Sequence, residues 1–224
     1  MPSATSGPPK NSDLHGNVPD KSPVVLVVID VINDLEFEGG DALEEPALAM
    51  AHALRPLLDR ARAAKIPVVY ANDNFGRWRS DFHAQVDHCL HEHVRGRELA
   101  RLLRPDEDDY FVLKPKHSAF FATAFDTLLD YLNARTLILA GIATDSCILA
   151  TAIDADMRDL RVVVAQDCVA AISPERHERA LAHMRETLDV RTMDGADIDF
   201  DALAAERAED EAATSAARDP AKRS

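Results

Sequence analysis

The sequence predicts an α/β protein with three layers, in which helices cover both faces of a mainly parallel, six-stranded, doubly wound sheet. One observation is that apolar runs such as SPVVLVVID at 22–30 and TLILA at 136–140 are continuous rather than alternating. This pattern is typical of strands buried on both faces of a parallel sheet. A second observation is that such runs alternate with segments of helical periodicity, which indicates right-handed βαβ crossovers.

The elements are expected to follow one another as strand and helix along most of the chain. Each strand is a short β-branched run, and each helix carries apolar residues at spacings of three and four. The expected strands are 22–30, 66–72, 110–114, 136–140, 161–167 and a short one near 189–193. The expected helices are 46–64, 82–94, 97–103, about 121–132, about 144–158 and 174–187, the last opened by Ser173 and Pro174.

Length and composition fit a single globular unit with flexible ends. A chain of 224 residues with 46% hydrophobic and 29% charged residues can build one large core. We predict a flexible leader at 1–22, one domain at 23–203, and a polar tail at 204–224 that is a frayed helix or disordered.

Charge and cysteine usage limit the partners and the compartment. The formal net charge of −14 argues against a nucleic acid or an anionic membrane as partner. The N-terminus lacks the apolar core of a signal peptide, and no run approaches the roughly 18 apolar residues of a membrane span. The three cysteines, Cys89, Cys147 and Cys168, form no disulfide framework. A cytoplasmic protein is therefore expected.

Three reactive side chains are expected at the carboxyl ends of strands. Asp30 closes the first strand, Lys114 closes the third, and Cys147 follows the fourth by one turn. In a doubly wound sheet these ends share one rim, where ligands bind. Taken one at a time, each has a plainer explanation: Asp30 as a turn cap, Lys114 as a solvated strand end, and Cys147 as an ordinary buried cysteine.

The segment before Cys147 contains the residue types that begin helices. Thr144, Asp145 and Ser146 carry side-chain oxygens that accept hydrogen bonds from the unpaired N–H groups of a first turn. Cys147 is then expected in that turn, where the positive end of the helix dipole stabilises a thiolate.

Together, the three residues can perform nucleophilic attack on a carbonyl carbon. A carboxylate within hydrogen-bond distance can take the thiol proton, and an ammonium favours both the thiolate and the carboxylate. Backbone N–H groups at the helix start would bind the oxyanion, a contribution typically worth a few kcal/mol of barrier.

Three linked motifs resemble the isochorismatase-like cysteine hydrolase superfamily over about 23–192. They are VVLVVIDVINDL at 24–35, VLKPKHSAF at 112–120 and LILAGIATDSCILATAIDADMRDLRVVVAQDCVAA at 137–171. The resemblance implies an isochorismatase-like fold and a catalytic triad of Asp30, Lys114 and Cys147. It also implies a cis peptide between Ala143 and Thr144 that aims the amides of Thr144 and Cys147 at the oxyanion.

The same resemblance implies a chemistry and an assembly. We expect hydrolysis of an amide-like C–N bond of a small molecule through a thioester, without a cofactor, in a homo-oligomer (a dimer or a tetramer). Two alternatives remain open. One is an isochorismatase-type vinyl ether hydrolase that needs only the aspartate, and the other is a non-catalytic binding module on the same fold.

Two departures from the family pattern concern the first two strand ends. Ile32 stands where the motif D-x-Q-N-D-F has glutamine, and the metal motif of nicotinamidases is replaced by Asn72-Asp73-Asn74-Phe75, which has no histidine. We therefore expect no metal. The histidines of the 82–94 helix are better explained as a polar helix face than as metal ligands, because their spacing matches no established zinc pattern. They are His83, His88, His91 and His93.

The substrate pocket is expected to involve residues near the second and third strand ends. They are Asn72, Asp73, Phe75, Trp78 and Phe120, with ordinary loop or core packing as the alternative. Cys89 and Cys168 lack the turn context of Cys147 and are expected to be structural. Asp167 is expected to satisfy local backbone donors.

Overall fold

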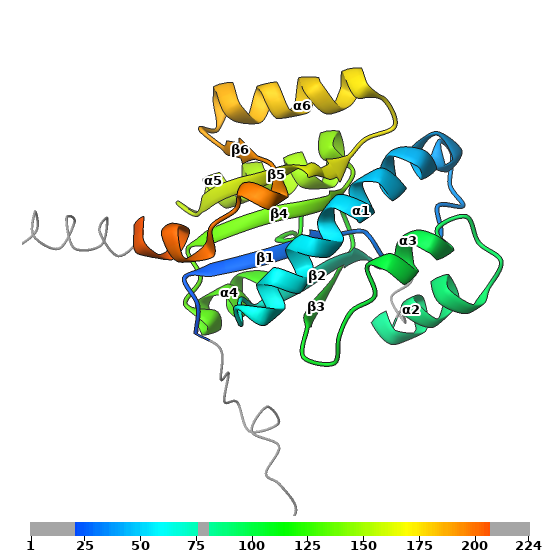
Figure 1. Cartoon of the computed structure of the whole chain (residues 1–224), viewed down its shortest axis with the longest axis horizontal. Coiled ribbons are helices and arrows are strands. Elements are labelled where there is room, and N and C mark those ends of the chain that lie inside the picture. Colours follow the sequence, from blue (N-terminus) through cyan, green and yellow to red (C-terminus); the bar gives the residue numbers. More distant parts are fainter. Residues whose placement is uncertain (1–20, 76–80, 207–224) are drawn as a thin grey trace, which may run out of the picture.

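Six parallel strands form one sheet in the order β3-β2-β1-β4-β5-β6 (Figure 1). The structure is a computed structural model, and it describes residues 21–75 and 81–206. The predicted α/β class is confirmed, with all six strands parallel rather than most of them. The strands are β1 (Val24–Ile29), β2 (Val68–Asp73), β3 (Tyr110–Lys114), β4 (Thr136–Ile142), β5 (Arg161–Ala170) and β6 (Arg191–Met193).

The helices connect the strands in the expected order. They are α1 (Gly40–Ala63), α2 (Phe82–His91), α3 (Arg97–Leu102), α4 (Phe125–Leu132), α5 (Leu149–Asp156) and α6 (Pro174–Thr187). A single π-helical turn, η2 (Thr144–Ile148), precedes α5, and a 3-10 turn, η3 (Gly195–Asp197), follows β6. Residues 200–206 are helical, so the predicted polar tail begins inside a helix.

The largest boundary error concerns α1, which begins at Gly40 rather than at 46. The predicted helix, 46–64, rested on the helical spacing of apolar residues from Leu48 onwards. In the structure the apolar stripe already includes Leu43, which is buried against the sheet together with Ala47 and Met50. Burial of this additional turn therefore extends the helix towards its N-terminus.

The sheet separates two apolar clusters, which explains why the strands are continuous apolar runs. Along β1, Val24, Leu26 and Val28 belong to the cluster that contains the buried residues of α1 and α3. The alternate residues of the same strand belong to the cluster that contains the buried residues of α4, α5 and α6. Because successive side chains of a strand point to opposite faces, every residue of β1 is buried.

The strand order reverses at β1, which lies between β2 and β4. Its contact with β4 is unusually close at Gly141, where φ is +115°. A Cβ at this position would lie 2.1 Å from the carbonyl oxygen of Ile29. Glycine therefore lets the end of β4 approach the end of β1, which brings the segments after Ile29 and Ile142 side by side.

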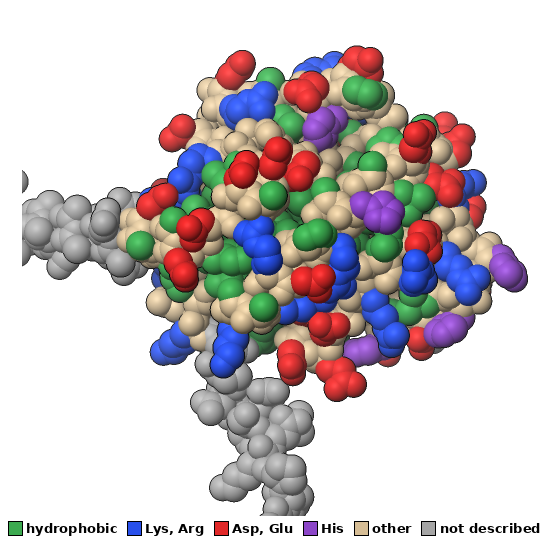
Figure 2. All heavy atoms as spheres, viewed as in Figure 1, with side chains coloured by type: hydrophobic (Ala, Val, Ile, Leu, Met, Phe, Trp, Pro, Cys, Tyr) green, Lys and Arg blue, Asp and Glu red, His purple; other side chains and the backbone are tan. Residues whose placement is uncertain are grey.

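Two further features concern the ends and the surface. The predicted leader at 1–22 and the predicted tail lie mostly outside the described residues. Within 21–75 and 81–206, none of the helices combines the length and apolarity needed to cross a membrane. On the face shown in Figure 2, acidic and basic side chains are interspersed.

Candidate active site

Three side chains from distant parts of the chain meet at the carboxyl ends of β1, β3 and β4. The Nζ atom of Lys114 lies 2.7 Å from Oδ2 of Asp30 and 3.5 Å from Sγ of Cys147. All three residues are buried, and Lys114 completely so. The structure thus brings together the three residues that the sequence analysis selected, and it places the thiol and the carboxylate beside the same ammonium group.

Backbone geometry at the strand ends fixes the acid and the amine. Asp30 is left-handed, with φ of 54°, a conformation that aspartate tolerates better than most residues. Its Oδ1 accepts a hydrogen bond of 2.7 Å from the backbone N–H of Asp73. Lys114 also donates to the carbonyl oxygen of Lys116 at 3.2 Å. Each charged group therefore has a partner besides the ion pair, as buried charges require.

The nucleophile lies in the tight turn η2. The amides of Ser146 and Ile148 both donate to the carbonyl of Ala143, at 3.1 and 3.2 Å, and enclose Cys147 between them. A cis peptide is present, but it joins Ile142 to Ala143 and not Ala143 to Thr144, so its predicted position is wrong by one residue. The reason is that β4 continues to Ile142 and η2 already begins at Thr144, which leaves Ala143 as the one connecting residue.

The N-terminal turn of α6 holds this nucleophile turn in place. Nδ1 of His177 lies 3.0 Å from Oγ1 of the fully buried Thr144. The neighbouring Arg176 forms an ion pair with Asp145. Burial lowers the pKa of His177, so its ring is neutral at neutral pH. Two consecutive residues of α6 therefore bind two consecutive residues of the turn that carries Cys147.

The electrostatics of the site keep the thiol protonated at rest. Burial, followed by the carboxylate of Asp30, raises the pKa of Cys147 to about 12, against the opposing effect of Lys114. This direction is opposite to that expected from a helix N-terminus alone, because removal from water and a neighbouring negative charge outweigh the dipole and the ammonium. Cys147 therefore needs a base to become a nucleophile.

Asp30 is placed to be that base. Burial raises its pKa above the ordinary value, although the charge of Lys114 opposes this. A carboxylate with a raised pKa binds a proton more readily. Burial also disfavours the charged form of Lys114, but the combined effect of Asp30, Cys147 and Asp73 raises its pKa, so it stays an ammonium.

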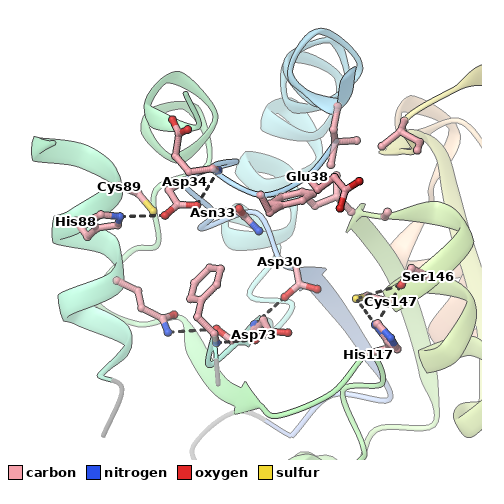
Figure 3. Close-up of a pocket in the computed structure, with 18 of the residues that line it drawn as sticks. Asp30, Asn33, Asp34, Glu38, Asp73, His88, Cys89, His117, Ser146 and Cys147 are labelled. Atoms are coloured by element: carbon pink, nitrogen blue, oxygen red, sulfur yellow. Dashed lines mark hydrogen bonds and ion pairs between the residues drawn. The ribbon is translucent and has the colours of Figure 1, made fainter. Parts of the chain in front are cut away.

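A pocket of about 760 Å³ opens over the thiol (Figure 3). Asp30 and Cys147 line its floor, and the loop 33–38 between β1 and α1 contributes much of the remaining wall. The lining also includes residues from the end of β2, from α2, from the β4–η2 turn and from the start of α6, together with His117. The volume suits a small-molecule ligand.

The predicted pocket residues divide into two groups. Asp73 and Phe75 line the pocket, whereas Asn72 and Phe120 do not. The amide of Asn72 bonds the backbone N–H and C=O of Ile32, at 3.2 and 2.8 Å. Phe120 is buried against Phe125, with ring centroids 4.9 Å apart. The fifth residue, Trp78, lies outside the described residues.

Several residues of the site have no role predicted from the sequence. Nδ1 of His117 lies 3.2 Å from Oγ of Ser146 and 3.8 Å from Sγ of Cys147. Its position inside the VLKPKHSAF motif was the available signal. The loop residues Asp34, Phe37 and Glu38 also line the pocket, and no periodicity marks them in the sequence.

The histidines of α2 form separate contacts rather than one cluster. His88 lies between Asp34 and Glu92, with nitrogen–oxygen distances of 3.1 and 3.2 Å, and its hydrogen bond to Asp34 raises its pKa. His91 lies against Asp87. In the described part of the chain, no group of three or more His, Cys, Asp or Glu residues is arranged to hold a metal ion.

The remaining cysteines are buried, and one lies nearer the pocket than expected. Cys89 lines the pocket from α2, and burial raises its pKa to about 12. Cys168 contacts Asp167, whose Oδ1 accepts a hydrogen bond of 2.6 Å from the amide of Gly195. Asp167 thus accepts from a backbone donor, as expected, but the donor lies 28 residues away in the chain rather than nearby.

Comparisons with known proteins give the chain's relatives. The family model of the isochorismatase domain matches residues 24–195. An uncharacterized isochorismatase family protein of Bacillus subtilis, YaaI, is 37% identical over 168 residues, which cover 75% of this chain and 92% of that protein. Maleamate amidohydrolase of Pseudomonas putida is 28% identical over 167 residues, covering 70% of this chain and 76% of the relative.

A solved structure gives the same result at the level of the fold. The crystal structure of nicotinamidase PncA from Bacillus subtilis matches with a TM-score of 0.60 and 27% sequence identity. The match covers 77% of this chain and 99% of the nicotinamidase chain. The similarity therefore extends over almost the whole length of that protein.

Proposed function

Because the chain belongs to the isochorismatase family of hydrolases, we propose that it is a cysteine hydrolase that cleaves an amide-like C–N bond of a small molecule through a thioester. The observation that carries this proposal is the meeting of Asp30, Lys114 and Cys147, with 2.7 and 3.5 Å between the ammonium and its two partners. The pocket above them gives a small amide access to the sulfur. Amidohydrolases among the relatives support the reaction class.

The first half of the reaction forms the thioester. Asp30 takes the proton from Cys147, and the sulfur attacks the carbonyl carbon, so a C–S bond forms and the π electrons move to oxygen. We assign the backbone N–H groups of Thr144 and Cys147 to this oxyanion. As the C–N bond breaks, Asp30 returns its proton to the leaving nitrogen, and the amine or ammonia departs.

The second half restores the enzyme. Asp30, again a carboxylate, takes a proton from water, and the oxygen attacks the thioester carbon. The C–S bond breaks, the sulfur regains a proton, and a carboxylic acid leaves. Throughout, Lys114 remains an ammonium that favours the negative charge on Asp30 or on Cys147, which fits the raised pKa of its amine.

The test is hydrolysis of a panel of nicotinamide, maleamate, aliphatic primary amides, ureido compounds and isochorismate, with ammonia or product release as the measurement. We expect Cys147→Ala to lose at least about 10³-fold in kcat on any amide that is turned over. We also expect intact-mass spectrometry of the native protein to detect an acyl adduct that Cys147→Ala lacks. Cys168→Ala is the matched control, since Cys168 lies outside the pocket lining.

Two results would contradict the proposal. Undiminished amide hydrolysis by Cys147→Ala would remove the nucleophile from the mechanism. Turnover of isochorismate alone, retained in Cys147→Ala and lost in Asp30→Asn, would instead assign the vinyl ether reaction, for which an acid suffices.

Assembly and location complete the proposal. We propose a homo-oligomer, a dimer or a tetramer, in the cytoplasm, with a small molecule as the binding partner of the pocket and neither nucleic acid nor membrane as a ligand. Light scattering coupled to size-exclusion chromatography measures the assembly directly, and a mass of 24.6 kDa would contradict it.

A further inference from the structure

The lining of the pocket is strongly unbalanced in charge. Seven carboxylate side chains line it, and Arg176 is the one Lys or Arg side chain that the described residues contribute to the same lining. The carboxylates are Asp30, Asp34, Glu36, Glu38, Asp73, Asp81 and Asp145. The outer face seen in Figure 2 differs, because it mixes both signs. The negative charge is thus gathered where a ligand would bind.

Part of this charge is neutralised by neighbours. Asp30 is paired with Lys114, and Asp145 with Arg176. On the loop wall, Glu36 lies 3.5 Å from a guanidinium nitrogen of Arg95. Even with these three cations assigned wholly to their partners, four of the seven carboxylates in the lining keep their charge or share it with a histidine.

Glu38 and Asp73 are the strongest candidates to meet a ligand. In the part of the chain that the structure describes, no Lys, Arg or His forms an ion pair with Glu38, whose carboxylate lies at the pocket in Figure 3. Asp73 lines the pocket from the end of β2. One of its carboxylate oxygens accepts a hydrogen bond from the backbone N–H of Phe75, and the other lies 4.0 Å from Nζ of Lys114. Carboxylates on separate segments of the chain therefore line the pocket that holds the thiol.

Aromatic rings accompany these carboxylates. Phe37 and Phe75 both line the pocket and are 46% and 42% exposed, although aromatic side chains are usually buried. Aromatic faces attract cations through their quadrupole, and proteins recognise quaternary ammonium groups with such rings. Two exposed rings next to Glu38 and Asp73 thus match a cationic group rather than an anionic one.

We propose that the pocket selects a positively charged substrate: an amide or ureido compound that carries an ammonium group beyond its carbonyl. This inference rests on the proposed function for the position of the carbonyl at Cys147. A cleft lined by one sign of charge concentrates ligands of the opposite sign and raises their on-rates by roughly 10–10³-fold. Carboxylate-bearing amides are correspondingly disfavoured. Arg77 and Arg79 lie outside the described residues.

The first experiment measures the charge preference without requiring any hydrolysis. The native protein is treated with trimethylammonioethyl methanethiosulfonate and, separately, with sulfonatoethyl methanethiosulfonate, a cation and an anion of similar size. Each transfers its thioalkyl group to the Cys147 sulfur, with methanesulfinate leaving and the thiol proton passing to solvent. Modification of Cys147 is followed by mass spectrometry of its peptide.

The quantity compared is the rate of modification by the cationic reagent divided by the rate for the anionic reagent. At about 20 mM salt, we expect this ratio to be at least tenfold higher for Cys147 than for a free small thiol. The ratio should fall towards the free-thiol value at about 500 mM salt, because salt screens the field of the carboxylates. A ratio at or below the free-thiol value would overturn the proposal. Glu38→Gln should lower the ratio at low salt, and Glu45→Gln is the matched control, because Glu45 is exposed on α1 outside this pocket.

The second experiment uses three primary amides of equal length: γ-aminobutyramide, valeramide and glutaramate. We expect kcat/KM to decrease in that order and to be at least tenfold higher for the cationic γ-aminobutyramide than for the anionic glutaramate. In Glu38→Gln, we expect the difference in kcat/KM between these two amides to become smaller. The reverse order would overturn the proposal. If neither these three amides nor any amide or ureido compound of the earlier panel is cleaved, while the ratio of reagent rates at Cys147 is as expected, the proposed reaction fails but the charge selection of the pocket stands.

Discussion

The ammonium of Lys114 lies 2.7 Å from the carboxylate of Asp30, and neither side chain has appreciable contact with solvent. Two opposite charges removed from water in this way depend on one another, because either one alone would be buried without compensation. The pair also lies against the sulfur of Cys147. Its integrity therefore bears on both stability and reactivity.

Replacement of the amine tests this dependence. We expect Lys114→Met to lower the free energy of unfolding by about 3–5 kcal/mol, since it leaves Asp30 as an uncompensated buried charge. It should also reduce kcat by at least about 10²-fold. Urea denaturation and amide hydrolysis measure the two effects. Lys116→Met is the matched control, because Lys116 is exposed and offers Lys114 only its backbone carbonyl. Equal losses in the two variants would contradict the assignment.

The pH dependence of kcat/KM follows from the pKa directions. Asp30 acts as a base only when ionised, and burial raises its pKa above 3.8, so activity should rise with pH through that raised value. At the alkaline side, the pKa of Cys147 is about 12 and that of Lys114 is also raised, so we expect no decline between about pH 7 and 9. An acid limb at or below the ordinary pKa of an aspartate, or a decline before about pH 9, would contradict this assignment.

Gly141 tests how the strands position the site. In Gly141→Ala, the new Cβ would meet the carbonyl oxygen of Ile29 at 2.1 Å, where only backbone movement gives relief. We expect a loss of more than about 3 kcal/mol in the free energy of unfolding, together with a lower kcat, because Cys147 would shift from Asp30. Gly39→Ala is the control: its φ is also positive, but nothing lies within 4 Å of the new Cβ. We expect it to cost only about 1–2 kcal/mol of backbone strain. Similar losses in both variants would show that the close approach is unimportant.

Asn72 provides a separate test of what lines the pocket. Its side chain bonds both backbone groups of Ile32, so Asn72→Ala should leave a buried N–H and C=O unsatisfied. We expect a loss of about 1–3 kcal/mol in the free energy of unfolding. At temperatures where the variant is folded, KM should change less than it does in Asp73→Asn, which alters a true lining residue. A KM effect of Asn72→Ala larger than that of Asp73→Asn would return Asn72 to the pocket.

The contrast between Asn72 and Asp73 shows where prediction from sequence stopped. Both residues end β2 and both are polar, so both were expected at the rim. Because successive strand residues point to opposite faces, only one of the two can face Lys114. In the structure that residue is Asp73. The sequence marks the strand end, but it does not say which of two neighbouring side chains faces the site.

The three central residues could be predicted because parallel strands constrain them. The end of each buried run is visible in the sequence, and the carboxyl ends of parallel strands meet at one edge. Asp30, Lys114 and Cys147 were found in this way. The loop that supplies Asp34, Phe37 and Glu38 has no such signal, because neither strand nor helix periodicity applies to it. His117 was likewise visible as a residue of a motif, but its distance from Cys147 depends on how that loop folds.

The sheet order also has a consequence for synthesis. β1 is made early, but its neighbour β4 is made only after β2 and β3. A chain still emerging from the ribosome therefore carries the acid and the amine long before it carries the sulfur. Until β4 docks beside β1, the sulfur has no base next to it, so a chain that is synthesised past Cys147 but not yet folded presents an ordinary, unactivated thiol. Reactivity is thus one of the last properties that the folding protein acquires.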